Sequence, residues 1–176
     1  VSCNGVLFDG AQIGQRGVYV TGANLNFYEN TFVNFYTLTL SAISIFIDYS
    51  VQTDKVATIR NNKITEMYGA TRAILAVSPT SATGNCKVVI QDNYFNNIFG
   101  REGDVMQFTD QLPDGSQSNS RVIVQGNYIG YSNRRGVKAQ GNNVTVKNNT
   151  FKTIDKNHPM WGLDGQGGAG VFSAFP

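Results

Sequence analysis

A repeated asparagine constrains the fold of this chain more than any other feature. Residues 17–32 align without a gap with residues 136–151, at an offset of 119 positions, and three further copies lie between them. Each copy is anchored on an asparagine that Phe or Ile follows two positions later. The anchors, Asn30, Asn62, Asn93, Asn127 and Asn149, are spaced by 32, 31, 34 and 22 residues. Periods of this length are typical of a solenoid whose coils carry loops of varying length.

The residues around each anchor alternate between apolar and polar. The positions five and three before the anchor, and two and five after it, form four columns in which nineteen of twenty residues are apolar and Ser132 is the exception. This alternation indicates strands with one buried face. A single coil cannot bury that face alone, whereas stacking at ~4.8 Å pairs each strand with its counterparts above and below.

The sequence therefore predicts an all-β fold, a single-stranded parallel β-helix of about six coils that forms one domain over residues 1–176. We expect the anchor asparagines to stack at one corner, to adopt the left-handed conformation and to join their amides into a ladder. A β-sandwich is the alternative for any glycine-rich, strand-rich chain. It predicts hairpin turns and does not account for a gapless repeat.

A second strand is expected in each coil, beginning with a small or acidic residue and a β-branched one. These pairs are Gly17-Val18, Ala42-Ile43, Ala73-Ile74, Asp104-Val105 and Gly136-Val137. Two residues further on, the expected inward column contains Val20, Ile45, Ala76, Gln107 and Ala139. The residues before the pairs form an outward column of Arg16, Ser41, Arg72, Gly103 and Arg135.

Charged residues gather around this outward column. Arg101, Glu102, Asp104, Arg134 and Lys138 lie beside it, and Glu66 lies on the preceding strand. We expect a band of mixed charge across three coils, with the loops 78–85 and 109–119 as the walls of a groove.

The band offers two kinds of chemistry on a sugar polymer. Glycoside hydrolysis requires two carboxylates. Glu102 and Asp104, two apart on an extended segment, share a face with α-carbons ~6.5 Å apart. Elimination on a uronic acid requires a base and cations that stabilise the developing charge.

The candidate catalytic residues are therefore Glu102, Asp104, Arg135 and Lys138. The candidate substrate-binding residues are Glu66, Arg72, Arg101, Asp110, Arg134 and Tyr131. The alternative for each charged residue is a surface salt bridge that contributes only ~0–1 kcal/mol.

Composition excludes several other classes. With 14 basic and 12 acidic residues the net charge is +2, which argues against nucleic acid as a partner. No apolar run approaches the ~20 residues of a membrane helix. The single histidine, His158, lies outside the repeat, and no cofactor or phosphate-binding motif is present. Calcium bound by Asp110 and Asp114 is the remaining metal alternative.

The coil motif resembles a known superfamily. Segments such as Val-Ile-Val-Gln-Gly-Asn-Tyr-Ile at 122–129 and Val-Thr-Val-Lys-Asn-Asn-Thr-Phe at 144–151 resemble the pectate-lyase-like right-handed β-helix proteins over nearly the whole chain. The uneven coil lengths and the Arg-Arg-Gly-Val-Lys segment at 134–138 resemble bacteriophage tailspike depolymerases. No family catalytic motif can be placed on individual residues.

The resemblance implies a function outside the cell. Tailspike depolymerases are homotrimers on the virion tail that bind bacterial surface polysaccharides and degrade them by hydrolysis or elimination. A non-catalytic adhesion or structural β-helix, and a bacterial uronate lyase or C5 epimerase, are the alternatives. We also expect residues 1–176 to be a fragment of a longer chain.

Overall fold

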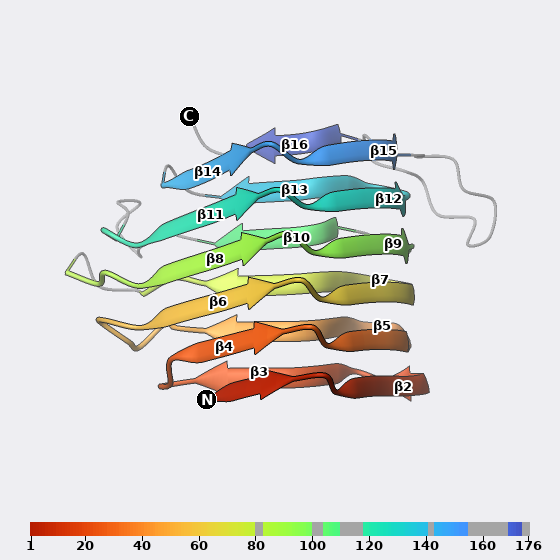
Figure 1. Cartoon of the computed structure of the whole chain (residues 1–176), viewed down its shortest axis with the longest axis horizontal. Helices are drawn as coiled ribbons and strands as arrows, with labels where there is room; N and C mark the ends of the chain where they lie inside the picture. Colours follow the sequence, from red (N-terminus) through yellow and green to blue (C-terminus); the bar gives the residue numbers. More distant parts are fainter. Residues whose placement is uncertain (80–82, 100–103, 110–117, 141–142, 155–168, 174–176) are drawn as a thin grey trace.

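The computed structural model describes residues 1–79, 83–99, 104–109, 118–140, 143–154 and 169–173. These residues form a right-handed parallel β-helix in which the chain climbs from the first coil to the last (Figure 1). Every strand pairing recorded among them is parallel, so the β-sandwich is excluded.

The first face is a six-stranded sheet whose strands follow one another in chain order. Its strands are β1 (Ser2–Asn4), β4 (Leu25–Tyr28), β6 (Val56–Arg60), β8 (Lys87–Gln91), β11 (Arg121–Gln125) and β14 (Val144–Lys147). The registers are continuous from β1 to β14, with no shift along the stack.

The remaining strands form the second and third faces, which are joined because β5 and β7 run around the corner between them. The second face contains β2 (Leu7–Gly14), β9 (Tyr94–Ile98), β12 (Tyr128–Ser132) and β15 (Thr150–Ile154). The third contains β3 (Arg16–Thr21), β10 (Asp104–Thr109), β13 (Arg135–Gln140) and β16 (Ala169–Ser173). β5 (Thr31–Asp48) and β7 (Lys63–Val77) belong to both.

The predicted inward columns of the first and second faces are confirmed. In the middle coils the side chains of these columns are completely buried: Ile59, Ile64 and Ile90 have no exposed surface. Ser132, the polar member, also points inward with no exposed surface, and its hydroxyl has no hydrogen-bond partner within the described ranges. Both cysteines are free, and Cys86 is buried while Cys3 is half-buried.

The predicted asparagine ladder lies at the first corner, between the first and second faces. Asn93 shows the pattern: its Oδ1 accepts from the backbone N of Asn62 at 2.9 Å and from the Nδ2 of Asn62 at 3.0 Å. Its own Nδ2 donates to the carbonyl of Ile59 at 2.9 Å and to the Oδ1 of Asn127 at 3.0 Å. Each buried amide is thereby satisfied by the coil below and the coil above.

One detail of this corner differs from the prediction. The left-handed residue is the one before each anchor, as at Asn61 (φ 55°), Asp92 (φ 53°) and Gly126 (φ 65°), and the anchors themselves are not left-handed. The preceding residue makes the turn, which leaves the anchor free to point inward and continue the ladder.

The predicted register of the third face is wrong in two coils. The inward column is Val20, Ile47, Ala76, Phe108 and Ala139, so Ile45 and Gln107 do not belong to it. Gln107 instead pairs with Leu75 and Lys138 on the outward side. The column expected to point outward contains Ile43 and Asp104 where Ser41 and Gly103 were expected. It does not point outward in the middle and upper coils, since Ile43, Asp104 and Arg135 are all buried.

The cause is the second corner, between the second and third faces. Between Thr37 and Ala42 the strand β5 takes five steps, whereas β7 takes two between their partners Gly69 and Thr71. Corners of unequal length shift every residue beyond them, and an alignment anchored on the asparagines does not detect the shift.

Candidate functional site

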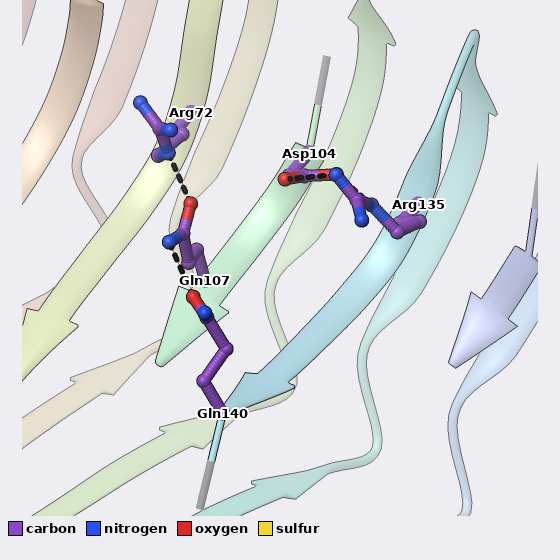
Figure 2. A network of polar contacts seen from close by, with 5 residues as sticks. All are labelled: Arg72, Asp104, Gln107, Arg135 and Gln140. Carbon is purple, nitrogen blue, oxygen red and sulfur yellow. Dashed lines mark hydrogen bonds and ion pairs between the residues drawn. The ribbon is translucent and has the colours of Figure 1, made fainter. Parts of the chain in front are cut away.

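Asp104 and Arg135, two of the predicted catalytic residues, form a buried ion pair on adjacent strands of the third face (Figure 2). Arg135 Nε donates to Asp104 Oδ1 at 2.6 Å and Arg135 Nη2 donates to Asp104 Oδ2 at 3.1 Å. The two side chains are 0% and 8% exposed. Burial raises the pKa of Asp104, while the guanidinium of Arg135 opposes that rise. A carboxylate with no exposed surface presents no oxygen to a polymer, so this geometry favours a structural role over the expected catalytic one.

Arg72, a predicted substrate-binding residue, lies beside this ion pair on the third face. Arg72 Nε donates to Gln107 Oε1, and Gln107 Nε2 donates to Gln140 Oε1 at 2.7 Å. Figure 2 shows this chain of side chains crossing three neighbouring strands, β7, β10 and β13. Gln107 is therefore the centre of a polar bridge between coils.

Arg134 directly precedes β13 and Lys138 lies on it, close in the chain to Arg135. Their positive charges oppose the rise in the pKa of Asp104. Arg72, Asp104 and Arg135, which the sequence groups with these two cations, do lie close to them in the structure. Glu102, Arg101 and Asp110 lie outside the described residues, so the expected pairing of Glu102 with Asp104 stays a prediction.

Glu66 and Tyr131 are packed at the second corner. Glu66 has a φ of 57° and accepts hydrogen bonds from Tyr68 Oη and, at 2.6 Å, from Asn97 Nδ2. Burial and the bond to Glu66 raise the pKa of Tyr68. Tyr131 contacts the ring of Phe99 edge-on, with centroids 4.8 Å apart. These contacts hold the side chains of Glu66 and Tyr131 against their neighbours, so fewer of their polar and aromatic groups are available to a ligand.

An open groove lies on another side of the coil, at the third corner, where the chain passes from the third face to the first face of the next coil. We call it the corner groove. Its volume is about 780 Å³, and its described lining is Asp54, Thr83, Asn85, Asn119, Arg121, Asn143 and Thr145. The lining residues come from the connections before β6, β8, β11 and β14, together with the first residue of β11 and the second residue of β14.

The backbone aligns these residues in rows across the coils. Asn85 N donates to the carbonyl of Thr53 at 2.6 Å, and Val122 N donates to the carbonyl of Asn143 at 2.9 Å. The corner groove therefore crosses successive coils at nearly a right angle to the strands. Three steps of ~4.8 Å make this row about 14 Å long.

The chemistry of the corner groove is polar. Amides, hydroxyls, one carboxylate and one guanidinium line it, and together they donate and accept hydrogen bonds in many directions. Such groups match a ligand rich in hydroxyls. Asp54 is the one carboxylate in the described lining.

The loops 78–85 and 109–119, expected from the sequence to wall a groove, do contribute Thr83, Asn85 and Asn119 to this one. The sequence predicts that groove beside the charged band, whereas it lies at the start of the first face. A signal was present: a polar residue stands six positions before four of the five anchors, as at Asn24, Lys87, Arg121 and Asn143. An outward polar column at the start of a strand marks the same edge in each coil.

Three further findings concern the described residues. No three His, Cys, Asp or Glu side chains among them gather as a metal site requires, and Asp110 and Asp114 lie outside them. None of their segments is a helix long and apolar enough to cross a membrane. The chain matches no protein-family model, no curated protein and no solved structure.

Proposed function

We propose that this β-helix binds a polysaccharide along the corner groove. The supporting observation is the polar lining that continues across successive coils. An extended polymer lying along the axis of the solenoid meets a new set of amides and hydroxyls at each coil. Repeated weak contacts of this kind suit a chain of repeating sugar units.

A bulky side chain inside the corner groove tests this proposal. Thr145 is exposed on β14 and lines the groove, whereas Thr150 is exposed on β15 of the second face. Thr145→Trp is expected to weaken polysaccharide binding at least about tenfold, because the indole occupies the space of a sugar ring. Thr150→Trp is the matched control and is expected to bind like the parent chain.

The measurement is isothermal titration with a panel of purified bacterial surface polysaccharides. Equal affinities of the two tryptophan variants for every polymer that binds would remove the corner groove from the proposal. Absence of binding by the parent chain across the panel would remove the function itself.

Cleavage of the bound polymer is a narrower proposal, which rests on the resemblance of the uneven coil lengths and of the segment 134–138 to tailspike depolymerases. Hydrolysis needs a second carboxylate besides Asp54. The assay follows reducing ends and absorbance near 235 nm during long incubation. Both signals together indicate a lyase, reducing ends alone indicate a hydrolase, and binding without product favours a non-catalytic adhesin.

The same resemblance supports a proposed setting for the protein. We place it outside the cell, on the virion tail in a phage, as part of a homotrimer acting on bacterial surface polysaccharide. Size-exclusion chromatography with light scattering on the purified chain tests the trimer: a mass of three chains supports it, and a stable monomer counts against it.

A further inference from the structure

Two cations lie side by side at the corner groove. Lys87 on β8 pairs in register with Arg121 on β11, so their side chains leave the same face of adjacent strands. Both side chains are exposed, and Arg121 lines the groove. Adjacent parallel strands place such residues ~4.8 Å apart at the backbone. Like charges directly opposite each other are unfavourable in a sheet.

This pair is exceptional within the molecule. Among the strand registers of the described residues it is the only pair of like charges. Other arginines have neighbours that compensate them: Arg135 is paired with Asp104, and Arg60 lies over the ring of Tyr28 at 4.8 Å.

Lys87 and Arg121 lack such compensation within the part of the chain that the structure describes. Neither side chain forms a hydrogen bond, an ion pair or a ring contact there. Asp54, the one carboxylate in the described lining of the groove, forms no ion pair with either cation. Arg121 therefore lines the groove with its charge uncompensated by any described residue, and Lys87 lies beside it on the adjacent strand.

We propose that Lys87 and Arg121 form an anion subsite of the corner groove, which selects polysaccharides whose units carry a carboxylate, sulfate or phosphate group. This inference rests on the proposed polysaccharide binding and deepens it by naming the class of polymer. A guanidinium offers two parallel donors to such a group, and the ammonium adds a second, freely rotating donor. An anion between them also relieves their mutual repulsion.

The experiment compares two double variants of equal net charge. Lys87→Gln with Arg121→Gln removes the subsite, and Lys63→Gln with Lys152→Gln removes two exposed lysines from the second face as the control. Each is titrated with alginate, dextran sulfate, polyphosphate and neutral dextran at two salt concentrations. The three anionic polymers distinguish carboxylate, sulfate and phosphate as the source of the charge.

The subsite variant is expected to lose at least about tenfold in affinity for the preferred anionic polymer, while the control stays within about twofold. The affinity of the parent chain is also expected to fall as salt increases, because the cations are exposed and therefore screened. Lys87→Arg, which keeps the charge, is expected to retain most of the binding.

The alternative outcomes separate the two proposals. Equal losses in both double variants would mean nonspecific charge attraction and overturn the subsite. Binding of neutral polymers only, with sensitivity to Thr145→Trp, would overturn the subsite and leave polysaccharide binding in place. Failure of every polymer would overturn both, and tighter binding of duplex DNA with the same sensitivity would assign the subsite to a nucleic acid.

Discussion

The first and second corners of this β-helix hold successive coils together in different ways. At the first corner one asparagine per coil donates to and accepts from its counterparts, and Asn30, Asn62, Asn93 and Asn127 are each no more than 2% exposed. At the second corner the number of residues differs between β5 and β7, and the contacts are individual ones, such as Glu66 with Asn97.

The comparison shows what fixes register in a solenoid. A ladder of identical amides tolerates only one alignment, because a slip by one residue leaves buried donors and acceptors without partners. Where no ladder exists, a corner accepts extra residues, and the strand beyond it is aligned by other means. On the third face the buried ion pair of Asp104 and Arg135 is one such means.

The largest expected effect is at the centre of the ladder. Replacing Asn93→Leu removes the oxygen that accepts from the backbone N and the Nδ2 of Asn62. It also leaves the carbonyl of Ile59 and the Oδ1 of Asn127 each short of one donor. Since an unsatisfied buried polar group costs about 1–3 kcal/mol, we expect a loss of about 5 kcal/mol in the free energy of unfolding. Urea denaturation followed by circular dichroism measures it.

Asn4→Leu, at an exposed asparagine of β1, is the control and is expected to change stability by less than about 0.5 kcal/mol. Similar losses in the two variants would show that the ladder does not determine stability, and the contrast between the corners would disappear.

The second prediction concerns the ion pair of the third face. Arg135→Met alone leaves the carboxylate of Asp104 buried without its partner, which is expected to cost about 3–5 kcal/mol. Combining it with Asp104→Leu removes both charges and is expected to restore most of the stability. A double-mutant cycle measured by urea denaturation checks this, and additive losses would mean that the pair does not act as a unit.

A third prediction uses two glycines with positive φ. A Cβ at Gly69 (φ 95°) would lie 1.8 Å from the carbonyl oxygen of Thr37 at the second corner, whereas the nearest atom at Gly22 (φ 71°) is 3.7 Å away. Gly69→Ala is therefore expected to lose about 3 kcal/mol of stability and Gly22→Ala about 1 kcal/mol. Equal thermal midpoints for these two variants would contradict the close approach of β5 and β7.

The smallest expected effect is at Gln107, which bridges Arg72 and Gln140. Gln107→Ala is expected to lower the free energy of unfolding by about 1 kcal/mol, the net value of ordinary side-chain hydrogen bonds. A loss as large as that of Asn93→Leu would mean that the third-face bridge contributes as much to stability as the ladder does. It would contradict the claim that the ladder differs from the individual contacts elsewhere.

The parts of the fold that the sequence predicts are those tied to the anchors. Columns within five residues of an asparagine are correct, because the short strands on either side of the first corner have constant length. The third face fails because its distance from the anchor varies, as the five steps of β5 against two of β7 show. Gln107 is predicted to lie in the inward column, but the predicted alignment is off by one position in this coil, and Gln107 points outward while Phe108 occupies the inward position.

The candidate site is predicted in part. Charges such as Asp104 and Arg135 are correctly brought together from their positions on adjacent coils, but sequence does not show that they pair and become buried. The corner groove depends on where Asp54, Asn85 and Asn143 come to lie after loops of different length. Loop length is read from the sequence, whereas the path of a loop is not.

The central claim is that equivalent residues of successive coils stack in one column. Nitroxide labels on the outward residues Ser2 and Ile123, or Ser2 and Thr145, measure it in a background with both native cysteines replaced. These pairs lie four and five strand positions apart on the first face, so pulsed electron resonance is expected to give distances near ~19 and ~24 Å, in proportion to the coils crossed. Distances that do not increase with each added coil would contradict the stacked architecture and, with it, the continuous corner groove.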